Sequence, residues 1–341
     1  MDAVLTALVE DRIGPGEQAK ELIKIAREKL EFDYCMALRS PATALFTALK
    51  SLGLTEGQGV VLSALSPIYY LNVLNDLKLK PIYADVEPGS PVMGRETLEK
   101  ALNSRPEGLE VKAVILHHTL GYVPDSAAIS ESGLPLIEDR SQSYGSSGKS
   151  VSAGSAVLTI LGLEERDMLT AGGGALLYAG NRRDAAILRS IGELPPEYGL
   201  PDMNAAMGTA QFRGASKNIQ RRQEIADAYY KAASRTRHKC FIQESDNTDD
   251  LTEADTRDRY NNYAFALILE TGMKDVKAYA KRKDVIVESA FDKTLAGAGI
   301  VAAGICPQAY SLTLRTVLFP LYPRLHTEEI ERISKLIVTL P

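Results

Sequence analysis

The sequence lacks the features of an exported, membrane-embedded or nucleic-acid-binding protein. Its three cysteines, Cys35, Cys240 and Cys306, are far apart and show no Cys-x-x-Cys or Cys/His spacing, which argues against a disulfide framework and a zinc site. No apolar run approaches the roughly 18 residues of a membrane helix, and Asp2 stands where a secretory signal would be basic. The net charge of −5 gives no general attraction to nucleic acid or anionic membrane. We therefore expect a cytoplasmic protein without a metal, membrane or nucleic-acid partner.

Lysine is absent from the whole stretch between Lys149 and Lys217. This stretch contains VLTILGLEERDMLTAGGGALLY (157–178), which is typical of an apolar strand, a charged loop and a glycine-rich turn into a second apolar strand. Schiff-base catalysis needs the primary amine of a lysine. The segment 157–178 therefore supplies no residue for that chemistry.

Short apolar runs alternate with amphipathic stretches in the first half of the chain. With 341 residues, 45% apolar and 24% charged, the chain is long enough for one large domain and a smaller one. Apolar runs at 59–64, 80–86, 111–118, 134–139, 155–161 and 174–179 are typical of buried strands in a mostly parallel sheet. Helical patterns lie at 42–53, 69–78, 94–102 and 182–192. This alternation predicts a doubly wound α/β domain.

A long helical pattern at 203–235 is followed by signals of a second, smaller unit. The polar segment 244–259 is typical of a loop or connection. Predicted strands at 263–269 and 285–290 and predicted helices at 273–283 and 327–340 complete a small α/β unit. We therefore divide the chain into a large domain, 1–235, which includes an N-terminal arm, and a small C-terminal domain, 236–341.

Asp139 and Gln142 follow the predicted strand 134–139, at a strand end where open α/β sheets bind ligands. A carboxylate at this position can pair with a protonated ring nitrogen of a ligand, or it can merely cap the next turn. The spacing alone favours the cap.

Several stretches, taken in order, resemble the DegT/StrS family of fold-type-I pyridoxal-phosphate enzymes, which mostly act as nucleotide-sugar aminotransferases. They are GPGEQAKELIKIAREKLEFDYCMALRSPATALFTALKSLGL, KPIYADVEP, HHTLGYVPD, GLPLIEDRSQSYG, AAMGTAQF with RRQEIADAYY, and LFPLYPRLHTEEIERI. The resemblance covers almost the whole chain. It implies a fold-type-I transferase architecture, a homodimer in which both subunits build each site, and pyridoxal phosphate as the cofactor.

The resemblance also implies positions for binding that cofactor. Asp139 matches the carboxylate that keeps the pyridine nitrogen protonated, and Gln142 and His118 match the residues that accompany it. Ser40 and Thr159 match phosphate-binding hydroxyls of the family. These five residues are the candidate cofactor-binding set.

Other positions depart from the family pattern. Its Ser-Phe-x-x-x-Lys motif, laid on 156–164, puts Glu164 where the imine lysine stands, and a shift by two residues reaches only Arg166. In the phosphate loop, Ser-Gly-Thr becomes Ser-Pro-Ala, so that Pro41 removes a backbone N–H from the cradle. Pro67 replaces a ring-stacking aromatic residue, and 197–199 reads Glu-Tyr-Gly instead of Asn-Tyr-Arg.

Together these departures favour a pseudoenzyme: a family homologue without Schiff-base catalysis and without a catalytic residue at the lysine position. Such a chain would bind a sugar nucleotide or another phosphate compound, or act as a regulatory or partner subunit in sugar-nucleotide metabolism. One alternative is an active pyridoxal-phosphate aminotransferase of amino-sugar or cell-surface polysaccharide biosynthesis, with Lys149 or Lys217 reaching the site. Another is a new chemistry in which Asp139, His118 and Glu164 act as acid and base groups.

Overall fold

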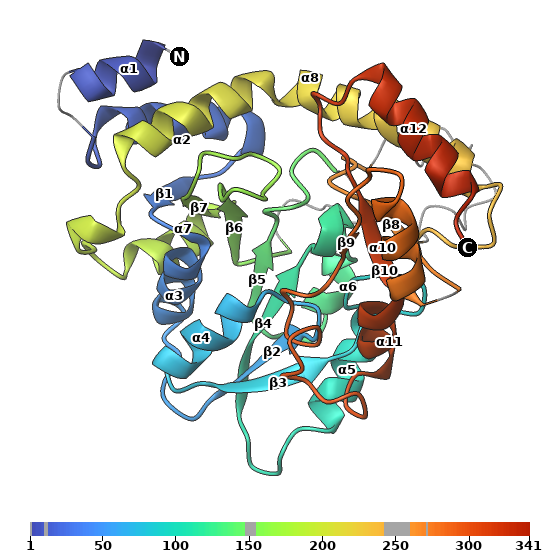
Figure 1. The fold of residues 1–341 in the computed structure, drawn as a ribbon. Coiled ribbons are helices and arrows are strands. Elements are labelled where there is room, and N and C mark those ends of the chain that lie inside the picture. Colours follow the sequence, from blue (N-terminus) through green and yellow to red (C-terminus); the bar gives the residue numbers. More distant parts are fainter. Residues whose placement is uncertain (1, 10–12, 147–154, 242–259, 271) are drawn as a thin grey trace.

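A mostly parallel sheet of seven strands forms the centre of the molecule (Figure 1). The computed structural model describes residues 2–9, 13–146, 155–241, 260–270 and 272–341. The strand order is β1-β7-β6-β5-β4-β2-β3, and β7 runs antiparallel to both of its neighbours, β6 and β1. The strands are β1 (Tyr34–Leu38), β2 (Gly59–Ser63), β3 (Lys80–Ala84), β4 (Val111–His117), β5 (Leu136–Asp139), β6 (Leu158–Gly162) and β7 (Ala175–Ala179). The predicted doubly wound α/β fold is confirmed, and β1 is a strand that the sequence analysis did not identify.

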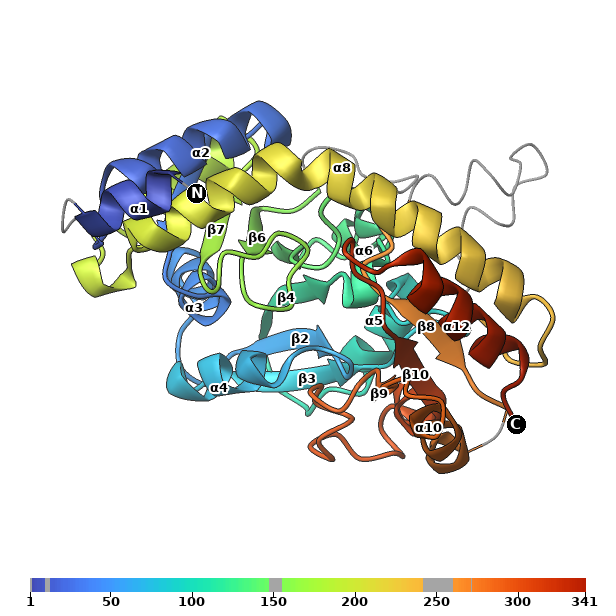
Figure 2. The same cartoon turned by 45° about the horizontal axis from the view of Figure 1, so that its top comes forward.

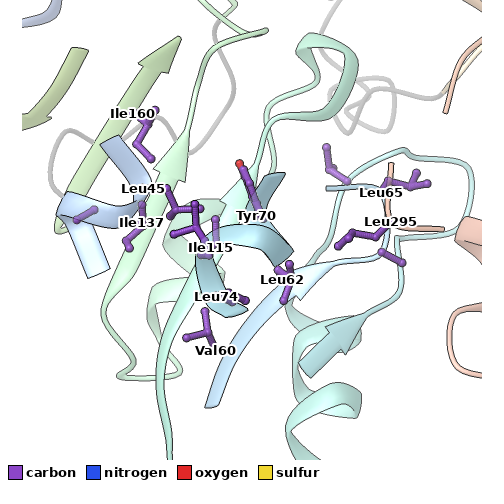
Figure 3. Packing of buried hydrophobic residues seen from close by; sticks show 14 of the residues in the cluster. Leu45, Val60, Leu62, Leu65, Tyr70, Leu74, Ile115, Ile137, Ile160 and Leu295 are labelled. Carbon is purple, nitrogen blue, oxygen red and sulfur yellow. The ribbon is translucent and has the colours of Figure 1, made fainter. Parts of the chain in front are cut away.

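Helices cover both faces of this sheet, so its central strands are buried on both sides. On one face, the α3/α4 face, helices α3 (Pro41–Ser51), α4 (Ile68–Asp76) and α7 (Arg182–Arg189) pack against alternate strand residues such as Ile115, Ile137 and Ile160 (Figure 3). The opposite face is called the reverse face. It is covered by α2 (Glu17–Leu30) and α8 (Asp202–Ala233) near β6 and β7, and by α5 (Arg95–Asn103) and α6 (Ser126–Ser130) near β2, β4 and β5.

A second, antiparallel sheet belongs to the C-terminal part of the chain. Its order is β8-β10-β9, with β8 (Phe265–Ile268), β9 (Glu288–Ser289) and β10 (Thr316–Phe319). Helices α10 (Met273–Lys281) and α12 (Thr327–Val338) share a hydrophobic core with it, and α11 (Pro307–Arg315) precedes β10. The strand predicted at 285–290 is thus short, and β10 was not predicted.

The long helix α8 connects the two parts. It packs against α2 in its N-terminal half and against α12 in its C-terminal half (Figures 1 and 2). Because α8 ends at Ala233, we propose that the large and small domains meet near residue 236. The predicted loop 244–259 lies outside the described residues. Within the described part of the chain, no helix combines the length and the apolar character needed to span a membrane.

Candidate functional site

Asp139 lies at the carboxyl end of β5, and the exposed fraction of this residue is only 1%. Its Oδ2 accepts hydrogen bonds from the Tyr69 hydroxyl at 2.9 Å and the Tyr70 hydroxyl at 2.7 Å. Its Oδ1 accepts from the backbone N–H of Ser141 at 3.0 Å and from the Ser141 hydroxyl. Each carboxylate oxygen therefore has two donors, and all four belong to the chain itself.

The two tyrosines come from the first turn of α4, which begins directly after Pro67. Tyr70 is fully buried, and Figure 3 shows its ring among the core side chains with the hydroxyl oxygen pointing away from Leu74. The two rings meet edge to face with centroids 4.9 Å apart. Burial, and next the negative charge of Asp139, raise the pKa of Tyr69 and Tyr70 well above the usual range. Both hydroxyls therefore stay protonated and donate to the carboxylate.

Asp167 brings a second carboxyl group to this region. Its Oδ2 accepts from the backbone N–H of Glu164 at 2.8 Å and lies against Gly162, where an added Cβ would approach that oxygen to 2.2 Å and Ser141 Oγ to 2.7 Å. Burial raises the pKa of Asp167 to about 7; the Glu164 N–H opposes this shift, and the charge of Asp139 adds to it. Glycine at position 162 therefore leaves the space in which Asp167 approaches the hydroxyl that binds Asp139.

Sequence reasoning missed Asp167 and selected Glu164 instead. The structure shows Glu164 half-buried, with its backbone N–H bonded to Asp167, while Arg166 is exposed and pairs with Glu288 at 3.0 Å. The spacing of the Ser-Phe-x-x-x-Lys motif fits Gly162 and Asp167 as well as it fits Thr159 and Glu164, since five positions separate each pair. In both registers an acidic residue stands where the family has lysine.

The candidate set does not lie on one face of the sheet. His117 pairs in register with Asp139, and its ring meets that of Tyr70 edge to face at a centroid distance of 6.0 Å on the α3/α4 face. His118 points to the reverse face, where its Nδ1 lies 2.8 Å from Ser143 Oγ. Thr159 pairs with Glu138, the neighbour of Asp139, and lines the reverse face as well. His118 and Thr159 therefore lie on the opposite face of the sheet from Asp139, because adjacent strand residues point to opposite faces, and their role in binding the cofactor stays a prediction.

Gln142 ties neighbouring turns together instead of contacting Asp139. Its Oε1 accepts from the backbone N–H of Leu120 at 2.7 Å, and its carbonyl accepts from Asn261 Nδ2 at 2.7 Å. Leu120 has a left-handed backbone with φ of 55°, a conformation that costs a non-glycine residue free energy. The Gln142 side chain therefore stabilises a strained turn at the end of β4.

Ser40 is the N-cap of α3. Its Oγ accepts from the backbone N–H of Thr43 at 3.1 Å and lies 2.9 Å from Thr43 Oγ1. Pro41 occupies the first helical position, which suits proline because the N–H it lacks has no intrahelical partner. An anion at this helix terminus would find the Ser40 hydroxyl already hydrogen-bonded to Thr43, and it would lack the backbone N–H that Pro41 does not have.

These residues do not fit pyridoxal phosphate held as an imine. The carboxylate that would face the ring nitrogen is saturated by donors of the chain, and the second group beside it is an acid, not an amine. Lys217 is exposed on α8, on the side of the reverse face, and Lys149 lies outside the described residues.

Comparison with known proteins identifies the family. The model of the DegT/DnrJ/EryC1/StrS aminotransferase family matches residues 1–338. Similar solved structures include the aminotransferase TlmJ from Streptoalloteichus hindustanus, with 19% identity over 98% of this chain and 94% of that one and a TM-score of 0.82. A DegT DnrJ EryC1 StrS aminotransferase from Brucella abortus shows 21% identity over 98% and 93% of the two chains, with a TM-score of 0.82. DesV of S. venezuelae, solved with a ketimine intermediate, shows 19% identity over 99% and 92%, with a TM-score of 0.81. The chain belongs to the DegT/DnrJ/EryC1/StrS aminotransferase family.

Proposed function

We propose that this chain is a family member that neither binds pyridoxal phosphate as an imine nor transfers amino groups. The observation that carries the proposal is the saturation of Asp139 by Tyr69, Tyr70 and Ser141. A ring nitrogen would have to displace the hydroxyl donors from a buried carboxylate, and each such charge-assisted hydrogen bond is worth about 1.5–3 kcal/mol.

The charge around the site supports the same proposal. Asp139 adds a negative charge and Asp167 adds a carboxyl group with a pKa of about 7 in place of a lysine, while the phosphate and aldehyde of the cofactor need positive or hydrogen-bond-donating partners. The terminus of α3 offers fewer donors because of Pro41 and the internal bond of Ser40. Weak, non-covalent binding of the cofactor or of another phosphate compound is compatible with this arrangement.

The role that remains is one of binding or regulation. The family match over nearly the whole chain supports a link to sugar-nucleotide metabolism. In that role the chain would bind a sugar nucleotide itself or would act through a catalytic partner. The rival function, an active sugar aminotransferase, is favoured by the same family match and would need Lys149 or Lys217 to reach the site.

We also propose a homodimer. The N-terminal helix α1 (Asp2–Val9) and the segment after it expose Leu5, Leu8, Val9 and Ile13, with exposed fractions from 50% to 85%. Apolar side chains exposed this far are costly in water, and an interface of more than about 2,000 Å² would cover them. Light scattering that gives a monomeric mass at micromolar concentration would contradict the dimer.

The decisive experiment is to trap an imine. The purified full chain is incubated with pyridoxal phosphate, its visible spectrum is recorded, and sodium borohydride is added before peptide mass mapping. We expect no yellow species that borohydride bleaches and no pyridoxyl-lysine peptide. A pyridoxyl adduct on one specific lysine, such as Lys149, would restore the aminotransferase function.

A further inference from the structure

A cavity of about 810 Å³ lies on the reverse face of the large sheet, separate from Asp139. Its floor is formed by polar residues at the ends of β4, β5 and β6, and one wall is formed by α8, which Figure 2 shows running across these strands. The residues of the floor are His118, Glu138, Arg140 and Thr159. A cavity of this volume is in the range of small-molecule sites.

Polar groups of this floor lack partners within the described residues. His118 is 1% exposed; Ser143 binds its Nδ1, whereas its Nε2 has no hydrogen-bond partner. Glu138 is 6% exposed, and its carboxylate forms no hydrogen bond or ion pair with another described residue. The guanidinium of Arg140, on the same floor, likewise has no ion pair there. Buried polar groups are normally hydrogen-bonded, so this floor is suited to a ligand that supplies the missing partners.

The charges around the cavity restrict the class of ligand. Four carboxylates line it against two cations; they are Glu31, Glu138, Glu224 and Asp227 against Lys29 and Arg140. This balance disfavours a phosphate compound. A hydroxyl group donates one hydrogen bond and accepts others, so hydroxyls of one molecule can serve Glu138 and Arg140 together. Tyr144 and Tyr178 add aromatic surface to the walls.

We propose that this cavity is a binding site for an uncharged, hydroxyl-rich ligand of the sugar class, held by Glu138, Arg140 and His118. The site is independent of the proposed loss of imine chemistry, because the sheet separates it from Asp139 and the tyrosines of α4. Burial lowers the pKa of His118 well below its usual range, so the imidazole meets the ligand in its neutral form.

The test is saturation-transfer NMR on the purified full chain with glucose, galactose, N-acetylglucosamine and uridine as separate probes. We expect saturable binding of at least one probe, weakened about tenfold by Glu138→Gln, since a charge-assisted bond is lost. Ser216 is an exposed residue of α8 that lines the cavity, and Ser216→Trp should abolish binding because the larger side chain fills the cavity. Glu56 is an exposed carboxylate that pairs with Lys78 away from the cavity. Glu56→Gln is the matched control, and this variant should bind the probe as the parent protein does.

Thermal melts recorded on every variant identify those that fail to fold, and Ser216→Trp tests the site even if Glu138→Gln does not fold. Three outcomes would overturn the proposal. One is the absence of saturable binding for all four probes, as expected of a cavity filled by water alone. Another is binding that both Glu138→Gln and Ser216→Trp leave unchanged. The third is binding that Asp167→Asn removes instead, which would place the sugar on the α3/α4 face.

Discussion

Asp139 and Glu138 are neighbours in β5, both are buried, and their carboxylates point to opposite faces of the sheet. Asp139 receives four hydrogen bonds from its own chain, whereas Glu138 receives none from any described residue and borders a cavity. A saturated buried carboxylate holds surrounding elements together, here α4 and the turn at Ser141. An unsatisfied one costs free energy that a ligand can recover. The comparison suggests that binding capacity in this chain lies on the reverse face.

Removing the two carboxylates should separate these roles most clearly. Asp139→Ala removes the acceptor of two tyrosine hydroxyls and of the backbone N–H and hydroxyl of Ser141, so we expect the free energy of unfolding to fall by about 3–5 kcal/mol. Glu138→Ala removes no hydrogen bond to a described residue and relieves the cost of an unsatisfied buried carboxylate, so we expect no loss of stability, or a gain below about 1 kcal/mol. Urea denaturation monitored by circular dichroism measures both. Equal losses for the two variants would end the distinction between a saturated and a free carboxylate.

The tyrosine donors should contribute unequally. Tyr70→Phe removes the hydroxyl of a fully buried side chain, and we expect a loss of about 1.5–3 kcal/mol. Tyr69→Phe should cost less because Tyr69 is only partly buried and its bond is longer. Tyr83 is a half-buried tyrosine on β3, and Tyr83→Phe serves as the control. A double-mutant cycle of Tyr70→Phe with Asp139→Ala should show that the two losses are not additive.

Asp167 should make stability depend on pH. Its pKa rises from 3.8 in the unfolded chain to about 7 in the folded protein, so between these values the folded state binds more protons. The free energy of unfolding should therefore fall as pH rises from about 4 to about 7, by an amount on the order of 1–2 kcal/mol because the residue is partly exposed. Asp167→Asn should flatten this part of the profile, as measured by urea denaturation at several pH values. A parallel profile for parent and variant would show that Asp167 ionises normally.

The sequence was sufficient for the elements whose patterns are strong and local. Apolar runs bounded by Gly, Pro or charge predicted β2 to β7, and the periodicity of 203–235 predicted α8. It failed for β1, in which only Cys35 and Leu38 are buried and which lies within a stretch that resembles the family's N-terminal arm and phosphate loop. Pairing with β7 decides that this segment forms a strand, and that pairing joins segments far apart in the chain.

The site was harder to predict for a geometric reason. Asp139 was found at a strand end, but the direction of a side chain changes with each strand residue. His117 and His118 are both buried, so composition gave no sign of which one shares a face with Asp139. The contact of Tyr69 and Tyr70 with Asp139 joins segments far apart in the chain, and spacing along the sequence does not report it.

The smallest effect is expected at the residue that the family motif first suggested. Glu164→Lys places an amine on a half-buried residue whose backbone N–H binds Asp167 and whose side chain forms no hydrogen bond with a described residue, so the free energy of unfolding should change by less than about 0.5 kcal/mol. The variant should form no imine with pyridoxal phosphate, because Tyr69 and Tyr70 still occupy Asp139, and a misplacement of about 1 Å can cost on the order of a hundredfold in rate. Asp167→Lys is the matched variant, since it brings an amine beside Gly162 and Ser141. Borohydride trapping and mass mapping of both proteins measure the result. An imine in Asp167→Lys but not in Glu164→Lys would show that the α3/α4 face still accommodates the cofactor and that one acidic residue blocks it. An imine in Glu164→Lys would instead support the register of the motif that begins at Thr159.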